Sequence, residues 1–283
     1  MPEPMPLAGG PGLCLASSTA IAPNSRMRDF DGKAVLITGG TKGIGKACAL
    51  EFSSRGACVI MAYGSDGSAA ESALGEVREQ GGKGFLIQSD LSQPDGVDKL
   101  WDSILSNNLK PEILILNGAY QEKVPALDTD ASLMQKTFQM NVFAGFLLAK
   151  ACIKHWIGHK RKGVIVIHSS GQSTHVHPSA FAYSVSKAAL DHMTRHLASV
   201  GAEHGIRVNG VNLGWFLTEG ERAFYGETEM IRAARDSVPL GRIGDPREAA
   251  KFTAFLAGDD CSYMTGSMLT YDGGYSLHPD TSK

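Results

Sequence analysis

Two side chains four residues apart, Tyr183 and Lys187, are the best-suited groups of this chain for moving a proton. Both fall in a predicted helix over 180–204, where the i, i+4 spacing places them on one face. An ammonium group beside a phenol favours the phenolate, so we expect Lys187 to lower the pKa of Tyr183 from about 10. Ser170, further upstream, can hold a carbonyl oxygen. A Tyr-x-x-x-Lys pair alone is more often part of a plain surface helix, so the surrounding elements decide whether this pair is catalytic.

The setting is an alternation of apolar runs with longer helical patterns. Several runs are continuously apolar, as strands buried on both faces should be. Strands are predicted at 34–38, 57–63, 84–88, 112–116, 163–168, 206–212 and 267–271, and helices near 43–55, 68–80, 95–107, 131–157, 180–204 and 246–257. This pattern predicts an α/β fold: a single-domain, Rossmann-type, doubly wound parallel sheet of about seven strands with helices on both faces. Ser170 then follows a strand at its carboxyl end, where the binding crevice of such a sheet lies.

A glycine-rich turn, Thr38-Gly39-Gly40-Thr41-Lys42-Gly43-Ile44-Gly45, joins the first predicted strand to the first predicted helix. Glycines permit a tight turn and let the backbone approach a pyrophosphate, whose charge a helix N-terminus favours. Glycines also make ordinary turns. The order strand, turn, helix nevertheless predicts a dinucleotide site.

Composition excludes several other classes of protein. The formal net charge is −2 without a basic run, which gives no reason to expect nucleic acid. The five cysteines are scattered and odd in number, which favours free thiols in the reducing cytoplasm. No apolar run approaches the roughly 18 residues of a membrane span. His175 and His177 lack a third ligand, so no metal site is predicted.

The first 29 residues differ from the rest, because proline and glycine recur there without a helical or strand pattern. We expect residues 1–29 to form a disordered extension and residues 30–283 to form the folded domain. An organellar transit peptide and an alternative start at Met27 are the other interpretations of this segment.

The motifs stand in an order typical of one family. Residues 38–45 match its TGxxxGIG turn, Asp90-Leu91 its adenine-contacting pair, and 116–119 its Asn-Asn-Ala-Gly stretch. Residues 212–218 match its Asn-Pro-Gly-x-x-x-Thr loop. From about residue 31 to 277 the chain thus resembles the short-chain dehydrogenase/reductase family. Its catalytic tetrad is matched by Asn141, Ser170, Tyr183 and Lys187.

The resemblance implies a role for each of these side chains. Tyr183 would donate a proton to a carbonyl oxygen that Ser170 orients, and Lys187 would hold the nicotinamide ribose. Asn141 would position a water that relays protons through Lys187. The implied cofactor-binding residues are Gly39, Thr41, Lys42, Gly43, Ile44, Gly45, Tyr63, Ser65, Asp90, Leu91, Asn117, Gly118, Tyr183, Lys187, Gly214, Phe216 and Thr218.

The cofactor is expected to be NADP(H), with NAD(H) as the alternative. NAD-preferring sites end their second strand with an acid that binds the ribose 2′-OH, and here that strand ends in Tyr63. Asp66 comes later, where capping of the next helix is its expected role. Lys42 and Ser65 can contact a 2′-phosphate instead.

Four residues depart from the family pattern. Leu116 replaces the first asparagine of its stretch, and Gly118-Ala119 inverts the usual order of small residues, both with little expected effect. Leu213 replaces a proline, which is expected to loosen the loop over the nicotinamide. None of these changes touches the tetrad.

The resemblance implies an NADPH-dependent oxidoreductase that reduces a ketone or aldehyde to an alcohol, reversibly, acting on a small molecule. The alternatives are a non-redox or coupled biosynthetic reaction on the same scaffold and a non-catalytic dinucleotide-binding protein. The family also implies a lid near 215–240 and a homotetramer or homodimer in which the helices near 131–157 and 180–204 pair. An apolar or aromatic ketone of moderate size suits the expected substrate contacts, with a sugar or a polyketide-type substrate as the alternatives. These contacts are Gln172, His177, Trp215 and Phe224.

Overall fold

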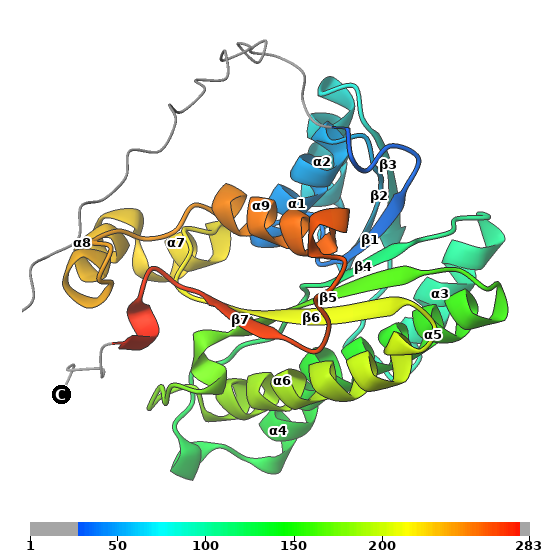
Figure 1. Cartoon of the computed structure of the whole chain (residues 1–283). Helices are drawn as coiled ribbons and strands as arrows, with labels where there is room; N and C mark the ends of the chain where they lie inside the picture. The colour runs from blue at the N-terminus through cyan, green and yellow to red at the C-terminus, as the bar shows by residue number, and fades with distance from the viewer. Residues whose placement is uncertain (1–27, 278–283) are drawn as a thin grey trace, which may run out of the picture.

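The computed structural model describes residues 28–277, apart from the side chain of Phe224. Within this range all strands join one parallel sheet in the order β3-β2-β1-β4-β5-β6-β7, which confirms the predicted fold class (Figure 1). The strand order reverses between β1 and β4, the point at which such sheets form their binding crevice. The strands are β1 Ala34–Thr38, β2 Cys58–Tyr63, β3 Lys83–Gln88, β4 Ile113–Leu116, β5 Gly163–Ser170, β6 Ile206–Leu213 and β7 Met268–Tyr271.

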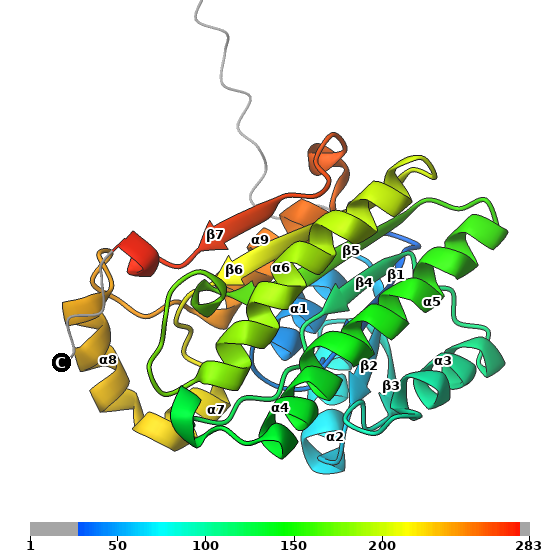
Figure 2. The same cartoon turned by 90° about the horizontal axis from the view of Figure 1, so that it is seen from below.

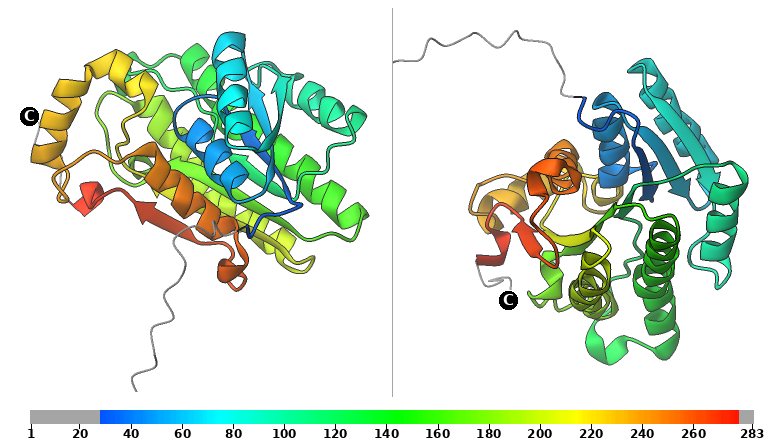
Figure 3. Two further views of the ribbon diagram at one scale, coloured as in Figure 1. Left: turned by 90° about the horizontal axis from the view of Figure 1, so that it is seen from above. Right: turned by 45° about the vertical axis from the view of Figure 1, so that its right-hand side comes forward.

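Helices cover both faces of the sheet. On one face lie α1, α2 and α9, and on the other lie α3, α5 and α6 (Figures 2 and 3). Two short helices, α7 and α8, lie beyond the carboxyl ends of β6 and β7 (Figure 2). The helices are α1 Gly43–Ser54, α2 Gly67–Glu79, α3 Gly96–Ser106, α4 Ala131–Phe138, α5 Ala144–Gly158, α6 Phe181–Ala202, α7 Glu219–Tyr225, α8 Glu227–Ser237 and α9 Pro246–Ala257.

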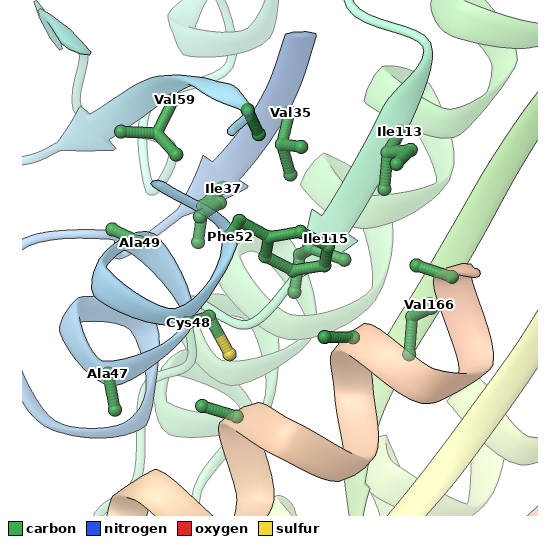
Figure 4. Packing of buried hydrophobic residues seen from close by; sticks show 14 of the residues in the cluster. Val35, Ile37, Ala47, Cys48, Ala49, Phe52, Val59, Ile113, Ile115 and Val166 are labelled. Carbon is green, nitrogen blue, oxygen red and sulfur yellow. The ribbon is translucent and has the colours of Figure 1, made fainter. Parts of the chain in front are cut away.

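Alternate residues of each central strand pack into two separate hydrophobic cores, one on each face of the sheet. In β1, Val35 and Ile37 pack with Phe52 of α1 (Figure 4). Leu36 belongs to the core on the opposite face, which α5 and α6 cover. All four side chains are fully buried, and each such burial contributes about 1.5–3 kcal/mol. Burial on both faces explains why these strands are continuously apolar in sequence.

The helix predicted over 131–157 is wrong in one respect, because it is interrupted. A π-helical turn, Gln139–Phe143, separates α4 from α5. Asn141 lies in this turn and is buried, and its amide pairs with both backbone polar groups of Tyr120. These bonds satisfy the backbone polar groups of Tyr120 in the loop after β4. Helix propensity depends on neighbouring residues and could not indicate this turn.

The two ends of the chain and the lid complete the description. Residues 1–27 of the expected extension lie outside the described residues, while Phe30 is fully buried against Phe52, with ring centroids 4.9 Å apart. The expected lid holds α7 and α8, which join at Gly226 with φ +76°. Between residues 28 and 277 the structure has no helix long and apolar enough to span a membrane.

Candidate active site

The glycine turn between β1 and α1 leaves no room for larger residues. A Cβ at Gly45 would lie 2.0 Å from the carbonyl oxygen of Gly39, whose φ is +60°. Asn117 fastens the turn to β4, because its Nδ2 donates to the carbonyl oxygens of Thr38 at 3.0 Å and of Gly39 at 3.2 Å. The residue at the N-cap of α1, Lys42, makes no side-chain cap. The turn therefore presents backbone N–H groups and the positive end of the α1 dipole to an anion.

A carboxylate from the lid lies against this anion-binding turn. The Gly43 N–H donates to Glu219 Oε2 at 2.9 Å, and Lys46 Nζ lies 3.6 Å from Glu219 Oε1. Burial works to raise the pKa of the Glu219 carboxyl, but hydrogen bonds from backbone N–H groups and the charge of Lys46 hold it below its usual value. An anionic oxygen in this position shows that the turn suits phosphate oxygens, so the residues present fit a dinucleotide.

Ser170, Tyr183 and Lys187 come together at the carboxyl end of β5. Ser170 is the last residue of β5, and its hydroxyl lies next to Tyr183 in the first turn of α6. Lys187 is buried one turn later, and its Nζ lies 5.4 Å from the centroid of the Tyr183 ring. Two hydroxyl groups thus stand side by side above a buried ammonium, as the sequence spacing predicts.

The expected lowering of the pKa of Tyr183 is wrong for this structure. Burial raises the pKa of Tyr183 to about 12, against the hydrogen bond from Ser170, and the charge of Glu221 raises it further. Lys187 Nζ donates to the carbonyl oxygen of His168 at 2.8 Å, and burial lowers its own pKa to about 8 although Asp191 opposes this. Desolvation is therefore the largest cause of both pKa shifts.

Asn141, the fourth expected catalytic residue, lies behind the cleft. Its Nδ2 donates to Ser186 Oγ at 2.9 Å, which ties the π-helical turn to α6. A cavity of about 10 Å³, the size of a single water, is lined by Asn141, Lys187 and His168 among others. Leu91, expected near the adenine, lines the same cavity.

Two functional residues were missed by sequence reasoning. His168 is buried in β5, with Nδ1 3.0 Å from Asn117 Oδ1 and Nε2 2.8 Å from Thr253 Oγ1. Burial lowers the pKa of His168 to about 3, and the charge of Lys187 adds to this effect. Asp191 accepts from Ser169 Oγ and, at 2.6 Å, from Ser173 Oγ. The single imidazole within an apolar strand is the signal that could have found His168.

The residues expected around the adenine ribose form a separate group. Lys42 Nζ is ion-paired with Asp66, whose Oδ1 also accepts from the Ala69 N–H at 3.0 Å. The predicted cap of α2 by Asp66 is thus confirmed. The strand ends as predicted at Tyr63, and Ser65 follows it. Asp90 closes its own turn by accepting from the N–H of Ser92 at 3.0 Å.

A cleft of about 300 Å³ brings about half of the predicted site residues together, among them three members of the tetrad. A larger groove of about 850 Å³ lies between α1 and α9 and is lined by Glu219, but by no tetrad side chain. The chemistry therefore belongs to the smaller cleft. Phe216 is buried and stacks on Tyr271, and Trp215 Nε1 donates to Glu221 Oε2 at 3.0 Å. The predicted residues lining the cleft are Ile44, Asn117, Ser170, Gln172, His177, Tyr183, Lys187, Gly214, Trp215, Phe216 and Thr218.

Some predicted residues fall elsewhere. The side chain of Phe224 lies outside the described residues. Leu213 stays within β6, and the N–H of Gly214 donates to the carbonyl oxygen of Tyr271 at 3.1 Å, so the strand itself holds the start of the loop.

Among residues 28–277, no group of three or more His, Cys, Asp or Glu side chains is placed to hold a metal ion.

Comparison with known proteins decides the family. A sequence model described as Enoyl-(Acyl carrier protein) reductase matches residues 39–276. The chain belongs to the short-chain dehydrogenase/reductase family. It is 33% identical to Glucose 1-dehydrogenase 2 of Bacillus subtilis over 89% of this chain and 98% of that protein. It is also 32% identical to 3beta-hydroxysteroid dehydrogenase 1 of Eggerthella lenta, over 89% and 96% of the two chains.

The fold matches solved structures of the same family. A short-chain type dehydrogenase/reductase from Mycobacterium marinum superposes with a TM-score of 0.81 and is 31% identical, over 89% of this chain and 98% of that one. As a member of the short-chain dehydrogenase/reductase family, the chain is an NAD(P)-dependent oxidoreductase acting on alcohol and carbonyl groups.

Proposed function

We propose that the protein is an NADPH-dependent carbonyl reductase, reversible as an alcohol dehydrogenase, with Tyr183 as its general acid and base. The observation that carries the proposal is the pair of neighbouring hydroxyls, Ser170 and Tyr183, which line a cleft next to the glycine turn together with the buried Lys187. Two donors at one point suit a carbonyl oxygen that gains negative charge during reduction.

Each residue then has a physical task. NADPH, when bound, supplies a hydride to the carbonyl carbon. Ser170 and Tyr183 donate to the carbonyl oxygen, and Tyr183 transfers its proton as that oxygen becomes an alkoxide. A phenol with a pKa of about 12 stays protonated at neutral pH, and an alkoxide is a stronger base than a phenolate. Lys187, with a pKa of about 8, can exchange a proton near neutral pH and restore the tyrosine.

The water-sized cavity supports the role expected of Asn141. Asn141 and Lys187 both line it, so a single water there could pass protons between bulk solvent and the ammonium. Asn141 Oδ1 accepts from the Tyr120 N–H and Nδ2 donates to the Tyr120 carbonyl oxygen, which holds the amide in place. Asn141 is therefore a positioning residue in this proposal.

The preference for NADP(H) over NAD(H) rests on two residues. Strand β2 ends in Tyr63, so no carboxylate stands where the ribose 2′-OH is usually bound. Lys42 would hold the 2′-phosphate, exchanging its present partner Asp66 for it. Because Asp66 competes for Lys42, we expect a moderate rather than an absolute preference.

The test is to follow nicotinamide oxidation at 340 nm over a panel of ketones, aldehydes and one enoyl thioester, with NADPH and with NADH. Tyr183→Phe should reduce turnover by a factor of about 10² to 10⁴ or more, while NADPH affinity, measured by fluorescence, stays within about twofold. Retained turnover in Tyr183→Phe would refute the assignment of the acid. A clear preference for NADH would refute the cofactor assignment. Reduction of the thioester alone would point to carbon–carbon double bonds.

We also propose a cytoplasmic homotetramer or homodimer. Large apolar side chains are exposed on the turn before α5 and on α5 and α6, with Phe143 50%, Phe146 42% and Val200 56% exposed. These are the helices expected to pair between subunits. The cysteines among residues 28–277 are free thiols, in keeping with a reducing compartment. A stable monomer in light scattering would contradict the assembly.

A further inference from the structure

The cleft around Tyr183 has charged groups on its lid side. Glu221 of α7 and Lys123 of the loop after β4 both line it, and both are half-buried. Lys123 Nζ lies 3.9 Å from the centroid of the Tyr225 ring, so the loop after β4 contacts the lid. Trp215 holds Glu221 against the wall through the 3.0 Å bond from its indole N–H. A wholly apolar ketone would cover these charged side chains without offering them hydrogen bonds, which is unfavourable.

The charge of Glu221 affects the pKa values of two neighbouring groups, Lys123 and Tyr183. Burial lowers the pKa of Lys123, and Glu221 works against that lowering. Burial raises the pKa of Tyr183, and Glu221 adds to that rise. The carboxylate is therefore close enough to act on the group that protonates the carbonyl oxygen, and on a substrate held there.

The pair of opposite charges selects among substrate classes. An anionic substrate would be repelled by Glu221 and a cationic one by Lys123. Hydroxyl groups both donate and accept, so they can satisfy both side chains at once. A carboxylate accepts about four hydrogen bonds, and Trp215 supplies one to Glu221. Gln172 accepts from Ser184 Oγ at 3.2 Å through Oε1, so the other end of its amide is a donor.

We propose that the substrate is a neutral carbonyl compound carrying hydroxyl groups next to the carbonyl, which donate to Glu221 and accept from Lys123. The proposal rests on the proposed carbonyl reduction and adds the class of substrate to it. The cleft of about 300 Å³ is at the small end of ligand sites, and its cofactor-binding residues would share that space with the nicotinamide, which leaves room for a short hydroxylated chain. This substrate class replaces the apolar or aromatic ketone that the sequence favoured.

Erythrulose and 2-butanone test the proposal, because they share a four-carbon skeleton and differ only in hydroxyl groups. We expect kcat/KM with NADPH to be at least about tenfold higher for erythrulose, since a site built for hydroxyls rejects an analogue without them. Glu221→Gln keeps the shape but removes the charge, and should lower the ratio of the two kcat/KM values at least about fivefold. Because hydroxyls also activate a carbonyl, the change in ratio is the decisive measurement.

Glu227→Gln is the matched control. Glu227 is also a lid carboxylate, but it pairs with Arg222 at 3.5 Å and does not line the cleft, so the ratio should not change. Lys123→Met should lower the ratio in the same direction as Glu221→Gln. Equal kcat/KM values for the two ketones in the unaltered enzyme, or an unchanged ratio in Glu221→Gln, would overturn the proposal.

A binding measurement separates this inference from the proposed function. If no carbonyl compound is reduced, the proposed function fails by itself. Calorimetry with the NADP⁺-loaded protein should still show tighter binding of erythritol than of 2-butanol, with that preference lost in Glu221→Gln. Equal binding of the two alcohols would overturn the inference whether or not the enzyme turns over.

Discussion

Replacing Glu219 by glutamine should tighten the binding of NADPH. In the structure the Glu219 carboxylate accepts from the Gly43 N–H at 2.9 Å and lies 3.6 Å from Lys46 Nζ. It therefore occupies the place where a phosphate oxygen would bind at the start of α1. Cofactor binding must break these contacts first, and the apparent affinity falls by the free energy that they contribute.

The size of the effect follows from the exposure of the carboxylate. A hydrogen bond to a charged group contributes about 1.5–3 kcal/mol when it is well buried. The side chain of Glu219 is 54% exposed, so solvent screening reduces the contribution to about 1 kcal/mol. Removing that competition corresponds to a Kd for NADPH about fivefold lower. Because the contact is electrostatic, the gain should shrink at high salt.

The assay is a titration of NADPH fluorescence at about 0.05 M and about 0.5 M salt, two conditions that differ strongly in screening. Glu76→Gln is the matched control, since Glu76 pairs with the same Lys46 at 3.2 Å but does not contact the glycine turn. Its Kd should stay within about twofold of the unaltered protein. Weaker NADPH binding in Glu219→Gln, or an equal gain in both variants, would refute the competition between lid and cofactor.

Three further predictions follow from the site. Asp66→Asn frees Lys42 and should raise the ratio of kcat/KM for NADPH over NADH severalfold; a lower ratio would contradict the assigned role of Lys42. The pKa of His168 is about 3 when folded and about 6.5 when unfolded, so its contribution to stability is complete above pH 6.5 and is lost as the pH falls toward 3. Urea unfolding should show that slope, and His168→Gln should flatten it. Gly45→Ala should abolish NADPH binding in the fluorescence titration, because its Cβ would collide with Gly39.

The sequence predicted the positions of Ser170, Tyr183 and Lys187 because their placement depends on local rules. A continuously apolar run ends at Ser170, and a helical spacing of four joins the other two. Parallel strands place all carboxyl ends at one edge of the sheet, so the cleft follows from strand order. These features need no knowledge of distant contacts.

Other features depend on partners far away in the chain. The π-helical turn exists because Asn141 pairs with the Tyr120 backbone, and the ion pair of Lys42 requires Asp66 from the next loop. The pKa of Tyr183 depends on how deeply the folded protein buries it, which no spacing of residues reveals. Sequence reasoning named these residues but did not find what they contact.

The three carboxylates of the site have a common physical consequence. Asp66 pairs with the expected phosphate-binding lysine, Glu219 accepts from the glycine turn, and Glu221 lies at the substrate cleft. The first two are anions on groups that suit phosphate, so cofactor binding is an exchange of one anion for another. This exchange weakens the binding of the cofactor but preserves selectivity for it, because a ligand without phosphates cannot replace the two carboxylates. Since Glu219 and Glu221 both belong to α7, that exchange must also move the helix that carries the carboxylate facing the substrate.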